Sequence, residues 1–315
     1  MNLLVIGLIF LGILFAVNMG GSGIAPTFSA EYGGGIISRK KASILFAIFV
    51  LLGAYLLGFR VVKVISKGLI NPELLNIKSA LIIFTGTTIA LFLANLFKIP
   101  ASTSQITVFS IVGYGAYHNA VKWEIFQRMI PLWIVLPFSA FLITFLCGKF
   151  IYPKIKDFKH NSIKFWDILT SCYTAFSIGS NNVANASGVF AGAQIMTSKL
   201  ATFILAPFFG IGGFVLGKGN LQSIGKKVTQ LDLISAGIIS LVTGSLLISA
   251  SLIGLPQSLV QLNSFAVFGF GVANRGKGIK KLGIKTIKKC FLTWIMSPIL
   301  GFSIVYLIAT IINKI

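Results

Sequence analysis

Two short clusters of glycine, serine and asparagine interrupt otherwise apolar segments of the chain. A helix interrupted inside a protein leaves backbone N–H groups without partners, and the positive end of its dipole attracts anions. Small residues let an anion approach the backbone, and Ser and Asn side chains donate hydrogen bonds without carrying charge. The clusters therefore predict a site for a small anion. The candidate ligands are Gly20, Gly21, Ser22 and Gly23 in the first cluster and Gly179, Ser180, Asn181, Asn182 and Asn185 in the second.

Two proline-led motifs add further candidates. Pro100 and Pro256 each open an apolar stretch, and proline suits the first turn of a helix, where its missing N–H costs little. The polar residues that follow would then lie beside free N–H groups. We expect four helix N-termini, two from each half of the chain, to converge on one site. The added candidates are Ser102, Thr103, Ser104, Gln105, Ser258 and Gln261.

Each of these features also has a plainer interpretation. The glycines are typical of close helix packing, and each proline alone indicates only the start of a helix. Polar residues at corresponding places in both halves favour a binding site over these alternatives. Trp133 and Trp294, by contrast, are interpreted as anchors at a membrane interface rather than as ligand platforms.

An internal repeat relates the two sets of candidates. Gly20–Pro26 matches Gly179–Asn185 at an offset of 159, and Ile99–Gln105 matches Leu255–Gln261 at an offset of 156. Trp133–Pro137 matches Trp294–Pro298 at an offset of 161. Three anchors in the same order indicate a duplicated unit. We assign residues 1–152 to the first repeat, 153–164 to a basic linker and 165–315 to the second repeat.

The composition places these repeats in a membrane. The chain of 315 residues is 56% hydrophobic and 10% charged, whereas soluble chains carry about 25% charged residues. The net charge of +21 comes from basic residues that lie mostly between apolar stretches, which favours cytoplasmic loops over nucleic-acid binding. The partner that this composition implies is therefore the lipid bilayer.

Ten apolar stretches are long enough to form membrane segments. Loops after odd-numbered stretches carry 19 of the 27 basic residues, including Lys98. This asymmetry predicts cytoplasmic odd loops, both termini outside and a multi-pass protein of the cell membrane. Five segments in each half would insert the second repeat upside down. The stretches are 3–30, 42–59, 79–97, 101–117, 130–152, 165–192, 200–217, 231–253, 256–273 and 286–312.

The fold class that follows is an all-α integral membrane protein with two inverted repeats of about five segments each. Broken or half helices are expected to meet at the midplane. Cys147, Cys172 and Cys290 have no paired spacing, and His118 and His160 lie in or beside loops. No nucleophile–base pair, metal site or cofactor is indicated, so we do not expect an enzyme. The sequence leaves a monomer or a homodimer open.

The two motifs also carry a family resemblance. Gly179–Ala186 resembles the G-x-N-D-x-A-N-A signature of the inorganic phosphate transporter (PiT) family, and Pro100–Gln105 resembles its P-x-S-T-T-H motif. The resemblance covers nearly the whole chain and implies alternating-access import of phosphate driven by sodium or protons. The signature Asp is replaced by Asn182 and Gly23, and the motif His by Gln105 and Gln261. The run Phe15–Gly23 is most similar to the sulfate-permease branch of the family.

The missing Asp bears on the substrate. Near neutral pH phosphate keeps a proton that needs an acceptor, whereas sulfate is fully ionised and is repelled by a carboxylate. Asn182 accepts a hydrogen bond without the negative charge, which favours sulfate. Loss of the carboxylate also removes a ligand suited to sodium. The sequence therefore favours a proton-coupled sulfate permease, with a sodium- or proton-coupled phosphate symporter and an anion channel or non-transporting scaffold on the same fold as alternatives.

Glu31 is the candidate for proton coupling, because it is the carboxylate closest in sequence to a signature cluster. Its plainer interpretation is a loop or interfacial residue near the basic stretch Arg39–Lys41. The other acidic residues fall near segment ends and are given no role. They are Glu73, Glu124, Asp157, Asp167 and Asp232.

Overall fold

The computed structural model describes residues 3–97, 101–156, 160–228, 232–274 and 277–312. Within these ranges the chain is helical, with one isolated β-bridge between Ile70 and Val121 and no β-strand. The first half contains α1 (Leu3–Gly23), α2 (Ala25–Gly33), α3 (Arg39–Leu57), α4 (Phe59–Lys67), α5 (Ile77–Leu96), α6 (Thr103–Tyr117), α7 (Trp123–Leu146) and α8 (Tyr152–Ile155). The second half contains α9 (His160–Asn182), α10 (Ala184–Gly192), α11 (Ser198–Val228), α12 (Leu233–Leu252), α13 (Leu259–Ala273) and α14 (Lys277–Ile312).

The outside of this bundle is apolar. In the described part of the chain, seven helical segments are long and apolar enough to cross a membrane. Large hydrophobic side chains point outward from the outer helices, for example Phe138 and Leu142 of α7 and Ile295 of α14, each at least 50% exposed. Such a surface is stable against lipid chains but not against water. The protein is a multi-pass membrane protein, as its composition predicts.

Two helices are interrupted where the sequence predicts. Ile24 separates α1 from α2, and Val183 separates α9 from α10. Both residues keep helical backbone angles, with φ and ψ of −67° and −31° at Ile24 and −59° and −31° at Val183. Each interruption is therefore a one-residue change in the helical hydrogen-bonding pattern, not an unwound segment.

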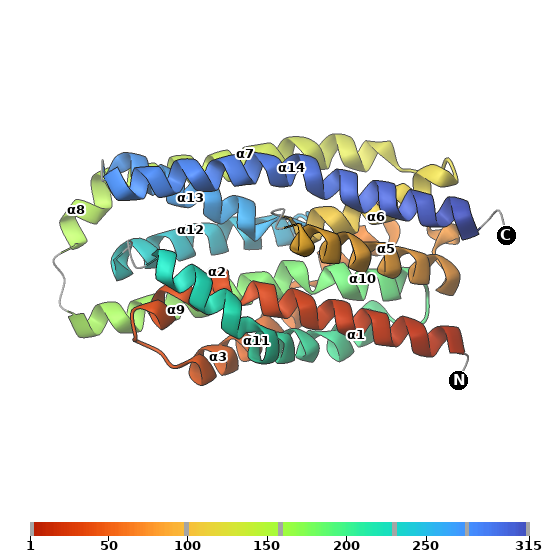
Figure 1. Cartoon of the computed structure of the whole chain (residues 1–315), viewed down its shortest axis with the longest axis horizontal. Helices are drawn as coiled ribbons and strands as arrows, with labels where there is room; N and C mark the ends of the chain where they lie inside the picture. Colours follow the sequence, from red (N-terminus) through yellow and green to blue (C-terminus); the bar gives the residue numbers. More distant parts are fainter. Residues whose placement is uncertain (1–2, 98–100, 157–159, 229–231, 275–276, 313–315) are drawn as a thin grey trace.

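Four of the ten stretches do not cross from one end of the molecule to the other. The α5–α6 pair enters and leaves by one end, and the α12–α13 pair enters and leaves by the opposite end (Figure 1). The turn before α13 lies in the interior, since Leu255 and Gln257 are at most 4% exposed. The expectation of alternating loops is wrong for these two hairpins, because apolar length alone does not distinguish a crossing from a helix that turns back. Lys98, assigned to an odd loop, lies outside the described residues.

The inverted repeat is visible in how the helices cross. A Cβ atom on Gly20 of α1 would lie 2.0 Å from the carbonyl oxygen of Phe209 in α11, and one on Gly179 of α9 would lie 2.0 Å from that of Val50 in α3. The same contacts are made in the other direction. A Cβ atom on Gly212 of α11 would meet the carbonyl oxygen of Val17 in α1, and one on Gly53 of α3 would meet that of Phe176 in α9. The two crossings thus pair α1 with α11 and α3 with α9, at the same offset of 159 that relates the signature clusters.

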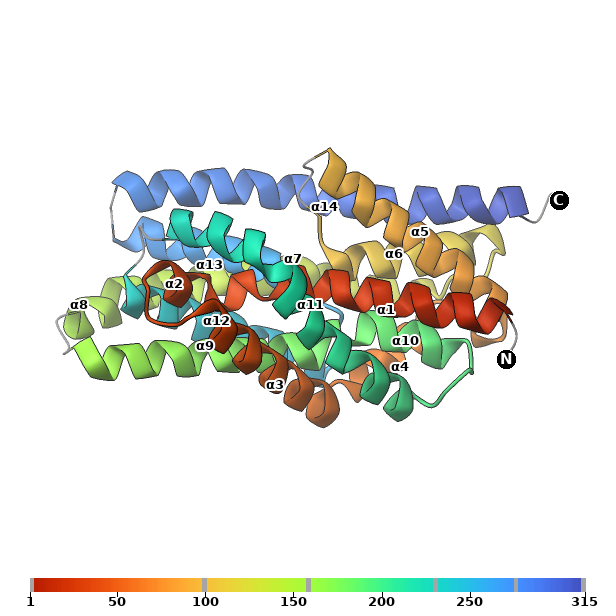
Figure 2. The same cartoon turned by 60° about the horizontal axis from the view of Figure 1, so that its bottom comes forward.

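A second group of helices packs α6 against α14 and α13 against α7, on the other side of the molecule (Figures 1 and 2). Trp133 belongs to this group. It is 5% exposed, and its Nε1 donates to the carbonyl oxygen of Pro256 at 2.9 Å. The expectation that Trp133 is an interfacial anchor is wrong, because its indole N–H finds its partner inside the bundle.

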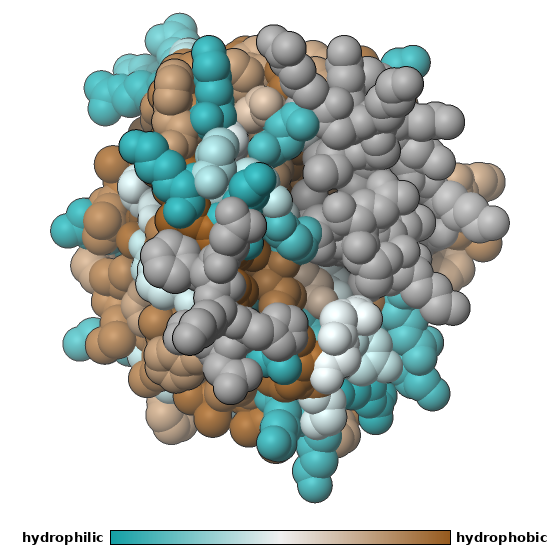
Figure 3. All heavy atoms as spheres, turned by 90° about the vertical axis from the view of Figure 1, so that its left-hand side faces the viewer, coloured by the Kyte–Doolittle hydropathy of each residue, from teal (hydrophilic) through white to brown (hydrophobic). Residues whose placement is uncertain are grey.

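One end of the molecule is markedly polar. Figure 3 views the end at which α8 lies, and hydrophilic side chains gather over it. Helices α2, α8, α11 and α13 end, and helices α3, α9, α12 and α14 begin, at this end of the molecule (Figure 1). The sequence between these helix ends follows odd-numbered stretches, which the charge asymmetry predicts to face the cytoplasm.

Candidate functional site

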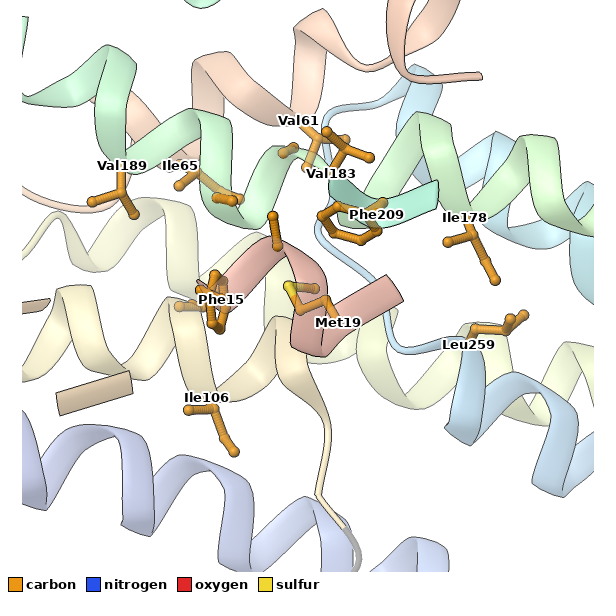
Figure 4. Packing of buried hydrophobic residues seen from close by; sticks show 14 of the residues in the cluster. Phe15, Met19, Val61, Ile65, Ile106, Ile178, Val183, Val189, Phe209 and Leu259 are labelled. Carbon is orange, nitrogen blue, oxygen red and sulfur yellow. The ribbon is translucent and has the colours of Figure 1, made fainter. Parts of the chain in front are cut away.

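The broken helices and the two hairpin tips enclose a small cavity. Its volume is about 120 Å³, enough for a few waters at on the order of 30 Å³ each, or for one small ion. Met19, Ile178 and Leu259 line it from three different helices and lie close together in Figure 4. The other lining residues are Asn18, Ser22, Gly23, Pro26, Leu91, Ala101, Ser102, Thr103, Ser104, Asn182, Ser258 and Val260.

The N-terminus of α6 forms one wall of this cavity. Ser102 is the N-cap, and its Oγ accepts from the backbone N–H of Gln105 at 3.3 Å. The backbone N–H of Ser102 donates to Ser297 Oγ of α14 at 2.8 Å, which fixes the entry into the helix. Ser102, Thr103 and Ser104 therefore lie at the start of the helix, as expected, and all three line the cavity. Pro100 lies outside the described residues.

The N-terminus of α13 forms the facing wall. Ser258 is its N-cap, and the Ser258 side chain makes no capping hydrogen bond. Pro256 precedes the cap, so the expectation that it lies in the first helical turn is wrong. The helix begins at Leu259, three residues after the proline.

Asn181 holds the second hairpin in place. Its Nδ2 donates to Ser251 Oγ at 3.0 Å and to the carbonyl oxygen of Leu255 at 2.9 Å, while its Oδ1 accepts from the backbone N–H of Gln257 at 2.9 Å. All hydrogen-bonding groups of the amide face protein partners except the second lone pair of the oxygen. Asn181 is fully buried and does not line the cavity, so it positions the α13 N-terminus.

Two further amide contacts join the halves. Asn185 Nδ2 donates to Ser104 Oγ at 3.0 Å, and Ser104 Oγ donates to the carbonyl oxygen of Gln257 at 3.2 Å. Gln261 Nε2 donates to Gln105 Oε1 at 3.0 Å. Each contact links a residue of one repeat to a residue of the other, so the motifs that the sequence pairs by offset also meet in space.

Several buried amide oxygens near the cavity have no partner among the described residues. They belong to Asn182, Asn185, Gln257 and Gln261, and the side-chain nitrogen of Gln257 is also unpaired. Rotation of an amide by 180° exchanges its oxygen and nitrogen, so each group can present an acceptor or a donor to a ligand. Of these residues, Asn182 lines the cavity.

Other sequence candidates face neighbouring helices. Gly20 and Gly179 make the close crossings described above, and a Cβ on Gly21 would lie 2.6 Å from the Cβ of Leu216 in α11. Ser180 Oγ is hydrogen-bonded to Ser251 Oγ at 2.9 Å, which ties α9 to α12. These four positions serve the packing that surrounds the cavity.

Sequence reasoning missed two polar residues. Asn18 lines the cavity, four residues and one helical turn before Ser22, and its signal is an amide inside a long apolar segment. Gln257 is completely buried, with both polar side-chain atoms unpaired among the described residues. Its signal was its place inside the second proline motif.

The cavity wall carries no charged side chain. None of its lining residues is Asp, Glu, Lys, Arg or His. Favourable potential for an anion therefore comes from hydroxyl and amide dipoles and from the N-termini of α6 and α13. A neutral wall of this kind binds an anion without repelling a second negative charge on it.

Glu31 lies away from this wall, at the end of α2. It is 1% exposed and its Oε1 accepts from Ser171 Oγ of α9. The plainer interpretation of Glu31 as a loop or interfacial residue is wrong, because α2 carries its side chain into the bundle. Asp167, which was given no role, is also completely buried.

Comparisons with known proteins agree with this architecture. The model of the phosphate transporter family matches the chain twice, over residues 19–163 and 151–305. The chain belongs to this family. The double match recognises both repeats, and the family is the one whose signature the motifs resemble.

A named relative and a solved structure are each similar to this chain over nearly its whole length. The sulfate permease CysP of Bacillus subtilis is 34% identical over 312 residues, which cover 97% of this chain and 87% of that protein. A solved structure described as the sodium-dependent phosphate transporter superposes with a TM-score of 0.86 at 22% identity, covering 100% of both chains. This likeness confirms the fold class of inverted repeats with broken helices.

Proposed function

We propose that the chain is a secondary-active permease that imports a tetrahedral inorganic oxyanion, sulfate ahead of phosphate, across the cell membrane. The observation that carries the proposal is the uncharged cavity at the N-termini of α6 and α13, with Asn182 in place of the signature Asp. The similarity to a sulfate permease supports the same substrate.

The choice of sulfate rests on charge and hydrogen bonding. A carboxylate at position 182 would repel either anion, but hydrogen phosphate can offset the repulsion by donating its O–H to the carboxylate, and sulfate has no proton to donate. Asn182 retains a hydrogen-bonding group and removes the repulsion. Discrimination between these anions thus depends on whether position 182 carries a charge, since the other residues of the cavity wall are neutral.

Alternating access is supported by the symmetry of the fold. The α5–α6 hairpin reaches the cavity from one end of the molecule and the α12–α13 hairpin reaches it from the other (Figure 1). Inverted repeats of this type can open a central site to either side by moving one group of helices against the other. We propose protons as the coupling ion, since the cavity has no carboxylate for sodium.

A second candidate is a phosphate symporter, coupled to sodium or protons. The solved structure with the same fold bears that description. An anion channel on the same fold is the third candidate, because a channel also has a central cavity along its pore. A carrier and a channel differ in countertransport, in which unlabelled anion inside a vesicle accelerates the entry of labelled anion.

The test is uptake of labelled sulfate into liposomes that contain the purified protein, with and without excess phosphate. We expect uptake that follows an imposed proton gradient, ignores a sodium gradient and resists phosphate. Uptake of labelled phosphate that requires sodium would establish the second candidate. Equal uptake with and without internal anion would favour the channel.

A further inference from the structure

A pair of buried carboxyl groups lies at the end of α2 that is distant from the cavity. Glu31 is in the last turn of α2 and Asp167 is in the first half of α9; both are at most 1% exposed. Ser171, which is hydrogen-bonded to Glu31, lies four residues after Asp167 on α9, so the two carboxyl groups lie on the same face of that helix. In a chain with six acidic residues, two of them face each other inside the bundle.

The hydrogen-bond partners of this pair favour a shared proton. Glu31 Oε1 accepts from Ser171, while Glu31 Oε2 and both oxygens of Asp167 have no donor among the described residues. Two ionised carboxylates side by side would repel each other strongly in a low-dielectric interior, and the Ser171 hydroxyl is a single neutral donor against two negative charges. A proton on either group supplies the missing donor and removes one charge, so the pair titrates as a unit.

The groups around the pair offer no neutralising cation. Within the described ranges neither carboxyl group makes an ion pair, and the electrostatic neighbours are the Cys172 thiol and the exposed Asp232, which is bonded by Tyr152. Gly237 of α12 faces Asp167, where an added Cβ would lie 3.4 Å from Oδ1. Helices α1 and α13, which also pack on α2, carry no charged residue. The remaining titratable groups with described side chains on α2, α3, α9 and α11 are Tyr32, Arg39, Lys40, Lys41, Tyr55, Lys164, Tyr173, Lys199 and Lys218.

The same two helices connect the pair to the anion cavity. Pro26 at the start of α2 lines the cavity, and Glu31 follows five residues later, about 7.5 Å along the helix axis. Ile178 and Asn182 of α9 line the cavity as well, and α2 packs beside α9 (Figures 1 and 2). A movement of α2 against α9 would therefore change both the cavity wall and the contact between the carboxyl groups.

We propose that Glu31 and Asp167 share one proton and that this carboxyl pair is the proton-binding site of the transport cycle. The inference rests on the proposed carrier function. In the shared state, the acid O–H of one group would donate to the other carboxylate. When the helices separate and water reaches the pair, that O–H bond breaks and the proton passes to water. Return of a proton from the other side restores the contact.

The test separates anion movement from proton coupling. Glu31→Gln and Asp167→Asn keep the size of each side chain and a hydrogen-bonding amide. In liposomes we expect each variant to exchange labelled against unlabelled sulfate at the wild-type rate, and to lose accumulation driven by a proton gradient down to the gradient-free level. Asp232→Asn, which removes an exposed carboxylate near the same pair, is the matched control and should accumulate sulfate as the wild type does.

Two outcomes would overturn the proposal. One is wild-type accumulation in both Glu31→Gln and Asp167→Asn. The other is that variants which elute as folded protein lose both sulfate exchange and proton-driven accumulation, because the pair would then be needed for anion movement itself.

A second readout does not depend on transport. Infrared spectra of the wild type at neutral pH should contain the C=O stretch of a protonated carboxylic acid, and the double variant E31Q/D167N should lack it. A wild-type spectrum without this band would show that no proton is shared. If the wild type moves neither sulfate nor phosphate, the proposed function fails, and the infrared band still decides whether the pair holds a proton.

Discussion

The two halves of the cavity differ in chemistry although they share one fold. Ser22, Gly23 and Pro26 of the first half occupy the positions of Asn181, Asn182 and Asn185 in the second. Ser22 Oγ donates only to the carbonyl oxygen of Met19 in its own helix, whereas Asn181 makes three hydrogen bonds to the α12–α13 hairpin. The two repeats thus share the backbone path and the crossings, while among the described residues only the second half holds its hairpin tip through the signature amide.

The largest expected effect comes from the feature that the halves share. Gly20→Ala and Gly179→Ala would each place a Cβ atom 2.0 Å from a backbone carbonyl oxygen, which no rotamer change can relieve. We expect each to destabilise the fold by about 3 kcal/mol or more. Thermal unfolding in detergent measures this. If Gly20→Ala left the stability unchanged and Gly179→Ala lowered it, the two crossings would not be equivalent.

The next effect distinguishes the halves. Asn181→Ala removes three hydrogen bonds and leaves buried partners unpaired, at about 1–3 kcal/mol for each unsatisfied group. Ser22→Ala, the matched change in the first half, removes one bond within a helix and should cost about 1 kcal/mol or less. The same unfolding assay compares them. Equal losses would contradict the asymmetry of the hairpin contacts.

A smaller effect is expected on binding alone. Asn182→Ala and Ser102→Ala each remove a polar group from the cavity wall. A hydrogen bond to a charged group contributes about 1.5–3 kcal/mol, so sulfate affinity should fall by roughly tenfold to a hundredfold. Equilibrium binding of labelled sulfate measures the loss, with monodisperse elution as the check on folding. Undiminished affinity in both variants would remove these residues from the site.

The smallest and most specific effect concerns selectivity. Asn182→Asp should shift the ratio of sulfate to phosphate uptake toward phosphate by about tenfold, because hydrogen phosphate can donate a charge-assisted hydrogen bond of about 1.5 kcal/mol to the new carboxylate and sulfate cannot. Gly23→Asp places a carboxylate at the matched position of the first half, where the atom nearest to an added Cβ is the tip of the Phe46 ring at 3.2 Å. An unchanged ratio in Asn182→Asp would refute the electrostatic account of selectivity.

The local signals in the sequence were strong enough to predict most of the architecture. Glycine, serine and asparagine inside apolar segments indicated the breaks at Ile24 and Val183, and the matched offsets indicated the repeat. The same signals did not separate packing glycines such as Gly179 from residues of the cavity wall such as Asn182, since both lie in one motif. Only the rotation of each residue about its helix axis decides which way it faces.

Long-range pairing was beyond the reach of the sequence. Glu31 and Asp167 are far apart along the chain, and Asp167 appeared to be an ordinary polar residue near the end of a segment. The re-entrant hairpins were missed for a related reason. Helices α5 and α12 have 20 residues each, which is the length of a membrane crossing, so composition could not show that each turns back inside the molecule.

The hydrogen bond between Gln105 and Gln261 has a consequence for ancestry. These residues occupy equivalent positions of the two repeats, and equivalent positions touch each other only on the axis that relates them. Before the duplicated genes were fused, that contact would have joined one glutamine to its own copy in a dimer of subunits inserted in opposite directions. Two amides on a two-fold axis can exchange reciprocal hydrogen bonds, whereas in the fused chain Gln261 donates to Gln105, so fusion allowed the two glutamines to take different roles.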